Sequence, residues 1–340
     1  MSSPGPAKVG GRYLLAVACD VEPVLVGQSR TAALDALTRD FKEISQLGFN
    51  TVMLRNVDED LQLDLLNAAQ SVGLLVVMAD RRSHYYVLTG CLPSGVSAVR
   101  EIPRHIPKAV AAHAGLGAFV VRPLQDPYAA DRAEQLRNAM RERGLPFALV
   151  EENRPDDAPS LVRIDTASAG LEENASPIES WLGQYHEGLS AGHTAGVVFD
   201  RFRRLPGSGL GIAPVDNPAH GARRAAVRML TDRAGLWGPR LLNLKTARIN
   251  ADAGVGHHVV VTAFIQGPRR YVMVFNRSAT RYTRQDLVLP ESIAGARVTR
   301  AVEVPPSRTG ALARVINRSG SRIALPVALR PGDAVLFELF

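Results

Sequence analysis

Short apolar runs alternate with segments of helical periodicity over the first two thirds of the chain. Residues 13–19 (YLLAVAC), 50–55 (NTVMLR) and 74–79 (LLVVMA) are near-continuous apolar runs, typical of strands that are buried on both faces. Segments 31–48 and 60–72 place apolar residues three and four positions apart, and a glycine ends each of them, which predicts two helices. The chain therefore begins as strand, helix, strand, helix, strand.

The alternation continues to about residue 236. Further strands are predicted at 116–121, 146–150, 161–164, 196–199 and 209–212, with helices at 106–113, 129–143, 177–191 and 221–236. Eight such units fit a (β/α)8 TIM barrel, an α/β fold of about 250 residues. An open doubly wound sheet is the competing arrangement, but no G-x-G-x-x-G loop follows the first strand.

The pattern changes after residue 253, where short strands separated by turn residues replace the helices. These strands are predicted at 258–265, 270–276, 281–289, 297–303, 311–317 and 334–339. They predict a small antiparallel β-sandwich domain. The expected organisation is a flexible tail at 1–11, the barrel at 12–250 and the sandwich at 251–340. The sandwich face toward the barrel is expected to be apolar, and its other face to carry the arginines; the apolar face would use Val260, Phe264, Val272, Val274 and Leu336.

Composition supports a folded globular chain. Hydrophobic residues make up 46% and charged residues 21%, which excludes a mostly disordered protein. Two cysteines cannot form a disulfide framework, and both are expected to be buried thiols. No apolar run approaches the roughly 20 residues that span a bilayer. The run ending at Cys19 resembles the core of a secretion signal, but a buried strand explains it, so a cytoplasmic location is favoured over secretion.

Positive charge is concentrated in the C-terminal quarter. Residues 246–340 contain 13 arginines against six acidic residues, whereas residues 1–245 contain 27 basic and 27 acidic residues. A basic nucleic-acid groove along the main body is therefore not expected. The basic part suggests an anionic partner such as an acidic polysaccharide, a membrane surface or an acidic protein. The alternative is that the arginines only form a solvated face.

Carboxylates follow nearly every predicted barrel strand, where active sites of barrel enzymes lie. They stand beside Arg, Asn or Gln, and they are Asp20, Asp80, Asp126, Glu151, Asp165 and Asp200. Sugar chemistry needs such a rim, because hydroxyl groups are held by many hydrogen bonds and two carboxylates perform acid–base work. Some acidic residues would instead cap helices, which explains Asp58–Asp60 well.

Several segments resemble the glycoside hydrolase barrels grouped as clan A. The resemblance is carried by FKEISQLGFNTVMLR (41–55), LLNAAQSVGLLVVMADRR (65–82), HAGLGAFVVRPLQDP (113–127), AGVVFDRFRR (195–204) and the C-terminal strands. It implies a catalytic acid at the end of the fourth strand and a nucleophile or base at the end of the seventh. The family has glutamates there, whereas this chain has Asp126 and Asp200. Asp126, Glu151 and Asp200 also match a layout that resembles the α-amylases.

The sequence thus predicts a glycoside hydrolase acting on a poly- or oligosaccharide. Asp126 is the expected general acid and Asp200 the nucleophile or base, with Glu151 and Asp165 as further candidates. The residues expected to bind substrate are Asp20, Arg55, Asp80, Arg122, Gln125, Tyr128 and Arg201. Tyr85, Tyr86 and Tyr128 are candidate sugar platforms, while Trp181 and Trp237 are expected in the core.

Two other function classes stay open. The first is a non-catalytic carbohydrate-binding or scaffold protein on a degenerate barrel. The second is a lyase or a metal-dependent aldolase, which would need a lysine or a metal cluster at a strand end. The expected partner is a carbohydrate, either neutral or anionic, with no nucleic acid, cofactor or metal. The oligomeric state does not follow from the sequence.

Overall fold

The structure is a computed structural model, and it describes residues 12–21, 27–92, 99–121, 127–149, 161–166, 177–202, 219–242, 244–249, 257–278, 280–290, 293, 298–307, 314–319 and 323–340. The chain forms two compact units. The first contains residues 1–166 and 195–217, and the second contains residues 167–194 and 218–340. These segments differ from the predicted division at residue 250, because the helices around residues 177–241 belong to the second unit.

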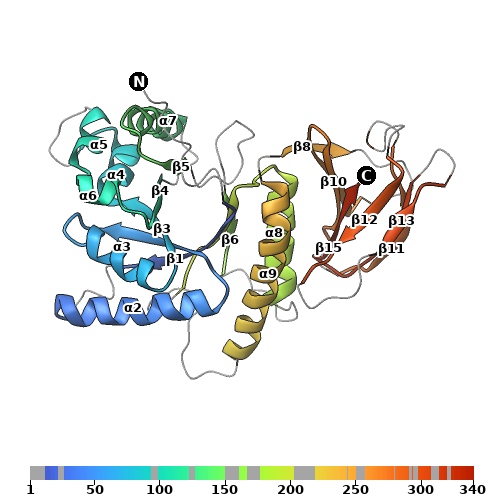
Figure 1. The fold of residues 1–340 in the computed structure, drawn as a ribbon, viewed down its shortest axis with the longest axis horizontal. Coiled ribbons are helices and arrows are strands. Elements are labelled where there is room, and N and C mark those ends of the chain that lie inside the picture. Colours follow the sequence, from blue (N-terminus) through green and yellow to red (C-terminus); the bar gives the residue numbers. More distant parts are fainter. Residues whose placement is uncertain are drawn as a thin grey trace. The chain divides into compact units, whose positions relative to one another are not determined.

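The first unit contains a seven-stranded sheet in which every described pairing is parallel. The strands are β1 (Leu14–Asp20), β2 (Thr51–Val57), β3 (Leu75–Asp80), β4 (Leu116–Val121), β5 (Phe147–Leu149), β6 (Leu161–Ile164) and β7 (Gly196–Phe199). Figure 1 shows β1, β3, β4 and β5 in blue to green. All side chains of β4 and β7 are buried, as continuous apolar runs predict.

The strand order is β5-β4-β3-β2-β1-β7-β6. Read from β6 toward β5, each strand is followed by the next one in the chain, apart from the step from β7 to β1. This is the order of a barrel rather than of a doubly wound sheet, in which the winding direction reverses.

The sheet departs from the predicted (β/α)8 barrel in two respects. Within the described residues β5 and β6 do not pair, so the barrel is not closed. Moreover, β7 pairs directly with β1, in the place that an eighth strand would occupy. The eighth strand predicted at 209–212 lies outside the described residues.

The helices of the first unit lie between consecutive strands. They are α2 (Arg30–Gln46), α3 (Gln62–Ser71), α4 (Arg81–Thr89), α5 (Ile102–His105), α6 (Lys108–Ala111) and α7 (Pro127–Glu142), with a 3-10 turn, η2, at Val99–Glu101. The helix α4 was not predicted from the sequence. Its start is fixed by Asp80, whose side chain accepts a hydrogen bond from the backbone N–H of Ser83, and it ends at the left-handed Gly90.

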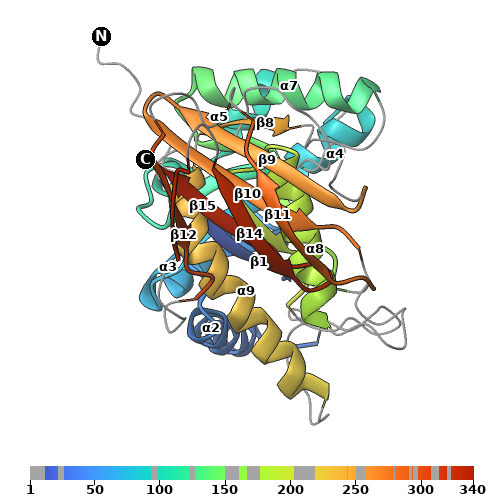
Figure 2. The ribbon, with the colours of Figure 1, turned by 90° about the vertical axis from the view of Figure 1, so that its right-hand side faces the viewer.

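The second unit combines two helices with antiparallel sheets. The helices are α8 (Pro177–Ser190) and α9 (Ala219–Leu241). A six-stranded sheet has the order β13-β12-β15-β10-β9-β8, and a second sheet pairs β11 with β14. The strands are β8 (Lys245–Ile249), β9 (Val259–Gln266), β10 (Arg269–Asn276), β11 (Thr283–Val288), β12 (Arg300–Val304), β13 (Val315–Asn317), β14 (Ala324–Leu329) and β15 (Ala334–Leu339). Figure 2 shows these strands in orange and red, with α8 and α9 beside them.

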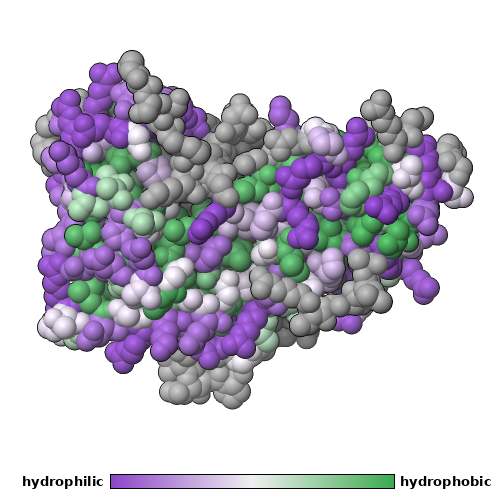
Figure 3. All heavy atoms as spheres, in the orientation of Figure 1, coloured by the Kyte–Doolittle hydropathy of each residue, from purple (hydrophilic) through white to green (hydrophobic). Residues whose placement is uncertain are grey.

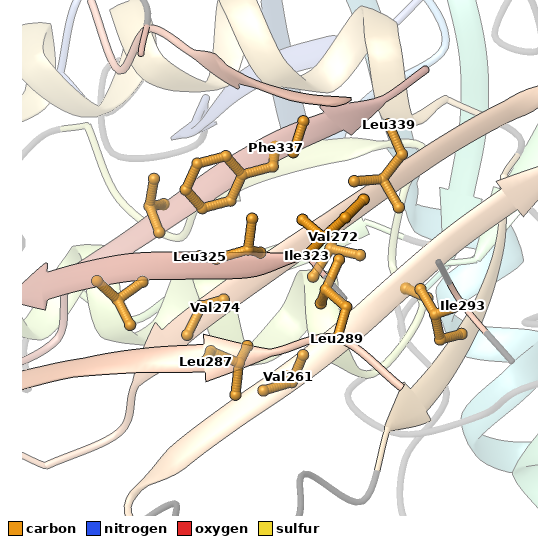
Figure 4. Close-up of a cluster of buried hydrophobic side chains, with 14 of the residues drawn as sticks. Val261, Val272, Val274, Leu287, Leu289, Ile293, Ile323, Leu325, Phe337 and Leu339 are labelled. Carbon is orange, nitrogen blue, oxygen red and sulfur yellow. The ribbon is translucent and has the colours of Figure 1, made fainter. Parts of the chain in front are cut away.

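The strand β10, inside the six-stranded sheet, is buried on both faces over most of its length. One face shares an apolar core with β11 and β14 that includes Val272 and Val274 (Figure 4). The opposite face of β10 carries Tyr271, Met273 and Phe275, which are also buried, and α8 contacts both β9 and β10. The predicted apolar face is therefore wrong for two of its five residues, whereas Val260, Phe264 and Leu336 pair with Phe275, Tyr271 and Met273 and share their face. Val272 and Val274 point into the core between the sheets, because side chains alternate along a strand.

A turn between β14 and β15 packs closely on α8. Gly332 in this turn has φ +69°, and a Cβ placed on it would lie 2.4 Å from the carbonyl oxygen of Glu179. The carbonyl of Gly332 accepts a hydrogen bond from Nδ1 of the buried His186, at 3.0 Å. The next residue, Asp333, forms an ion pair with Arg233 of α9 at 2.6 Å. One turn thus ties both helices to the sheet.

Replacing Gly332 by alanine should strongly destabilise the second unit. The left-handed backbone disfavours a Cβ by about 1 kcal/mol, and the contact with Glu179 adds a backbone collision. Thermal unfolding measures the loss. Gly267→Ala is the matched control, because Gly267 has φ +57° but no atom within 4 Å of the added Cβ. Equal losses in the two variants would contradict the close approach to Glu179.

Two sequence expectations about single residues are resolved. Trp181 and Trp237 are fully buried, which confirms their place in the core. Cys19 is buried, but Cys91 is exposed, so its prediction as a buried thiol was wrong.

None of the helices that the structure describes is both long and apolar enough to cross a membrane.

Candidate functional site at the carboxyl ends of the strands

Four predicted site residues lie along one edge of the parallel sheet. Asp165 and Asp200 directly follow β6 and β7, Asp20 ends β1, and Arg55 is the fifth residue of β2. These strands are neighbours in the order β6, β7, β1, β2, and they run parallel. Their carboxyl ends therefore meet at the same edge, which we call the carboxylate edge. Such edges hold the active sites of parallel α/β proteins.

The Asp200 carboxylate is buried and firmly positioned. Its Oδ1 atom accepts hydrogen bonds from the backbone N–H of Thr166, at 3.0 Å, and from the Thr166 hydroxyl, at 2.8 Å. Its Oδ2 atom accepts one from Arg163, at 3.3 Å. Asp200 is only 4% exposed. Thr166 thus engages one oxygen twice, and the second oxygen has a single partner among the described residues.

Asp165 lies between these partners along the chain but has a different environment. It is half-buried, whereas Thr166 on one side and Ile164 on the other are buried. Ile164 also accepts a backbone hydrogen bond from Asp200, which places the two strand ends side by side. Asp165 is therefore the more accessible of the two carboxylates at the ends of β6 and β7.

A second group of polar residues lies at the ends of β1, β2 and β3. Asp20 and Arg55 are register partners, and their charged groups are 4.0 Å apart. Both side chains are partly buried, at 21% and 31% exposure. His84, in the first turns of α4, has a pKa below its usual value because burial disfavours the imidazolium and the charge of Arg55 adds to this. Sequence reasoning left His84 out of the site.

Other candidate residues have structural partners. The Asp80 carboxylate, 5% exposed, caps α4 and accepts hydrogen bonds from both the N–H and the hydroxyl of Ser83. Tyr86 is buried and its hydroxyl donates to Gln135, so it cannot serve as a sugar platform, as the sequence suggested. Tyr85 and Tyr128 are exposed. Neither Asp80 nor Tyr86 is retained as a substrate-binding residue.

The acidic residues after β2 pair with arginines rather than capping the next helix. Asp58 and Glu59 approach Arg81 and Arg82, and Asp60 approaches Arg30. The first residue of α3 is preceded by Leu61, which makes no side-chain cap. The helix-capping interpretation of 58–60 was therefore wrong.

Four predicted site residues lie outside the described residues. They are Arg122, Gln125, Asp126 and Glu151. Arg201 is described and half-buried, next to Asp200. Within the described ranges, no three His, Cys, Asp or Glu side chains gather in a way that could hold a metal ion.

Comparison with known proteins supports the fold but identifies no family. No family model matches the chain, and no curated protein matches it. The solved structure of AmyP in complex with maltose is 11% identical, with a TM-score of 0.62 over 98% of this chain and 96% of that one. The α-glucosyl transfer enzyme XgtA is 11% identical, with a TM-score of 0.56 over 98% of this chain and 100% of that one. A noncanonic maltogenic α-amylase, AmyB from Thermotoga neapolitana, is 10% identical, with a TM-score of 0.53 over 97% of this chain and 98% of that one.

These neighbours match both units of the chain together, since nearly the full length is covered in each case. At such low identity the likeness concerns the fold alone. The resemblance to glycoside hydrolases that the sequence indicated thus holds at the level of the fold: the chain has the fold of glycoside hydrolases such as the amylases.

Proposed function

We propose that this chain is a glycoside hydrolase that cleaves a poly- or oligosaccharide with a pair of carboxylates. The observation that carries the proposal is Asp200, a buried carboxylate held by Thr166 and Arg163 at the edge where the strands end. A catalytic carboxylate must be held in one orientation, and hydrogen bonds from fixed donors achieve this. The fold shared with amylases supports the same reaction class.

Asp200 is suited to the nucleophile or base because one of its oxygens has a single partner among the described residues. In a retaining reaction this oxygen attacks the anomeric carbon, while the second carboxyl group donates its proton to the departing glycosidic oxygen. In an inverting reaction the carboxylate instead removes a proton from the attacking water. Asp126 remains our candidate for the proton donor, with Glu151 and the half-buried Asp165 as further candidates.

Substrate hydroxyls would be held by the polar residues along the same edge. Asp20 and Arg55 offer an acceptor and a fork of donors, and both are partly accessible. Because His84 is held neutral, it can donate one hydrogen bond and accept another, as a sugar hydroxyl requires. Arg122, Gln125, Tyr128 and Arg201 complete the proposed substrate contacts.

Asparagine substitutions test the catalytic assignment. Asp126→Asn and Asp200→Asn keep the side-chain volume and remove proton transfer or nucleophilic attack, so each should lower kcat by about 10²–10⁴-fold. Hydrolysis is measured on a panel of α- and β-linked oligosaccharides, and circular dichroism checks the fold. Asp131→Asn, at an exposed position of α7, is the control and should retain full activity.

Two results would overturn the proposal. Wild-type hydrolysis by both variants would show that this pair is not catalytic. A wild-type protein that binds oligosaccharides but cleaves none in the panel would favour a non-catalytic carbohydrate-binding protein.

A further inference from the structure

The sheet formed by β11 and β14 has one buried face and one exposed face. Leu287 of β11 and Leu325, Val327 and Leu329 of β14 point into the shared apolar core. The alternate positions point away from it and are exposed: Arg284, Asp286 and Val288 on β11, and Ala324, Pro326 and Ala328 on β14. Figure 3 shows one side of the molecule, where hydrophilic and hydrophobic residues lie next to one another on the surface.

Two further residues extend this exposed face. Thr283 pairs with Leu329, so the same register places Tyr282 opposite Arg330. The buried Asn276 fixes this corner, because its side-chain amide donates to the carbonyl of Arg281 at 2.7 Å and to that of Arg330 at 3.1 Å. Tyr282 is nevertheless 75% exposed. The ring thus stands on a rigid base, although nothing in the described chain covers it.

The two strands give the exposed face an uneven profile. β11 presents Arg284, Asp286 and Val288, whereas β14 presents only small side chains, with Cβ atoms of opposed residues about 5 Å apart. The result is a flat, weakly apolar strip beside a strand with charged side chains. An exposed tyrosine next to such a strip is suited to stacking against the face of a pyranose ring.

The described charges on this face are two arginines and one carboxylate. The guanidinium groups of Arg284 and Arg330 make no ion pair with any carboxylate in the described residues. Asp286, in the middle of β11, is the one carboxylate among the described residues of the face and can accept hydrogen bonds from hydroxyl groups.

We propose that this face, made by Tyr282, Arg284, Asp286 and Arg330 beside the small residues of β14, binds an acidic polysaccharide. Sugar rings stack on Tyr282 and lie over the strip of Ala324, Pro326 and Ala328. Their carboxylates pair with the arginines, since guanidinium groups bind carboxylates through two parallel hydrogen bonds. The choice of a carbohydrate rests on the proposed function, whereas the anionic character rests on the charges of the face.

A nucleic acid fits the same face less well. A phosphodiester backbone has no hydrogen-bond donor for Asp286. A hexuronate unit offers both a carboxylate for an arginine and hydroxyl donors for Asp286. The first unit adds no excess of positive charge, since residues 1–166 and 195–217 contain 21 basic and 22 acidic residues.

Binding to immobilised polygalacturonate tests the proposal on the full-length protein. Arg284→Glu combined with Arg330→Glu should raise the apparent Kd about tenfold or more, because attraction becomes repulsion at two contacts. Tyr282→Ala changes no charge and should raise it about threefold through lost stacking. Binding should also weaken when the salt concentration rises from about 20 to about 200 mM, where exposed charges are screened.

The control changes the net charge by the same amount elsewhere. Arg141→Glu combined with Arg143→Glu alters two exposed arginines of the first unit and should leave the Kd unchanged. If both double variants weaken binding equally, the binding depends on the net charge of the protein and not on this face, which would overturn the proposed site. Tighter binding of oligo(dT) than of polygalacturonate, at the same salt and through the same arginines, would overturn the choice of polysaccharide.

The outcome is separable from the proposed hydrolysis. Asp200→Asn should bind polygalacturonate as the wild type does, because Asp200 belongs to the first unit and the binding face to the second. Absence of polygalacturonate binding in an active hydrolase would overturn this inference alone. Binding by a protein that hydrolyses nothing would leave it standing and remove the proposed function.

Discussion

A chain that ends after residue 250 is expected to be insoluble. The cut leaves α8 and α9 but removes the sheets that belong to the same compact unit. Trp237 would lose the carbonyl of Pro305 that accepts its indole N–H at 3.1 Å, and the buried Arg233 would lose Asp333. A buried charge without its partner costs several kcal/mol, and each large apolar side chain returned to water costs about 1.5–3 kcal/mol.

The measurement is the soluble fraction after expression, followed by urea unfolding of whatever remains soluble. A chain that lacks residues 1–11, the segment expected to be a loose tail, is the control and should stay soluble. A fragment 1–250 that is soluble and unfolds cooperatively would show that α8 and α9 need no partner from the C-terminal sheets.

The truncation also shows what the amphipathic pattern could and could not predict. Periodic apolar residues correctly indicated helices at 177–191 and 221–236, close to the observed bounds of α8 and α9. The pattern indicates that one face of each helix is buried, but it does not indicate which sheet that face packs against. Both helices were assigned to a barrel because they follow β strands in the chain. Their contacts instead place them in the unit of the C-terminal sheets.

The missed elements have local reasons. No helix was predicted at α4, which opens with the polar residues Arg81, Arg82 and Ser83, although Asp80 and Gly90 are the cap residues that begin and end it. The strand β14 contains Pro326, which argues against a strand interior. Proline is tolerated there because β14 is an edge strand of the two-stranded sheet, so one of its sides needs no N–H donors. The strand β8 is short and half polar, so no apolar run marked it.

The candidate site was predictable in position but not in detail. Parallel strands bring their carboxyl ends together, so Asp20, Arg55, Asp165 and Asp200 could be expected at one edge. The sequence does not reveal that Thr166 holds Asp200. The backbone N–H and the hydroxyl of Thr166, at the end of β6, bind the Asp200 carboxylate at the end of the neighbouring β7. It also could not separate Asp80, which caps a helix, from the other carboxylates at the strand ends, because both follow a strand and precede polar residues.

The second unit is expected to lose stability steadily as the pH falls below 6.5. His186 is fully buried among the rings of Tyr185, Trp237 and Phe275. Its Nδ1–H donates to the carbonyl of Gly332, so Nε2 is the acceptor that faces the guanidinium of Arg233 at 3.4 Å. Protonation would place a second N–H against that cation.

Burial, followed by the charge of Arg233, lowers the pKa of His186 to about 3, and Asp333 only partly opposes this. In the unfolded chain the imidazole has a pKa of about 6.5. Between these values the unfolded state binds a proton that the folded state does not. The contribution of His186 to the free energy of unfolding should therefore be fully present above pH 6.5. Below pH 6.5 the free energy of unfolding should fall by about 1.4 kcal/mol for each pH unit. Asp333, whose pKa is lowered overall by Arg233 although burial alone would raise it, adds a further loss only at still lower pH.

Urea unfolding followed by tryptophan fluorescence measures this directly, because both tryptophans of the chain, Trp181 and Trp237, lie in the second unit. His186→Asn keeps a donor for Gly332 and removes the titrating group, so its stability should be lower at pH 7 but nearly independent of pH between 6.5 and about 5. His257→Asn, at an exposed histidine, should retain the wild-type slope. A wild-type slope that persists in His186→Asn would assign the acid sensitivity to other groups and show that the buried imidazole titrates alike in both states.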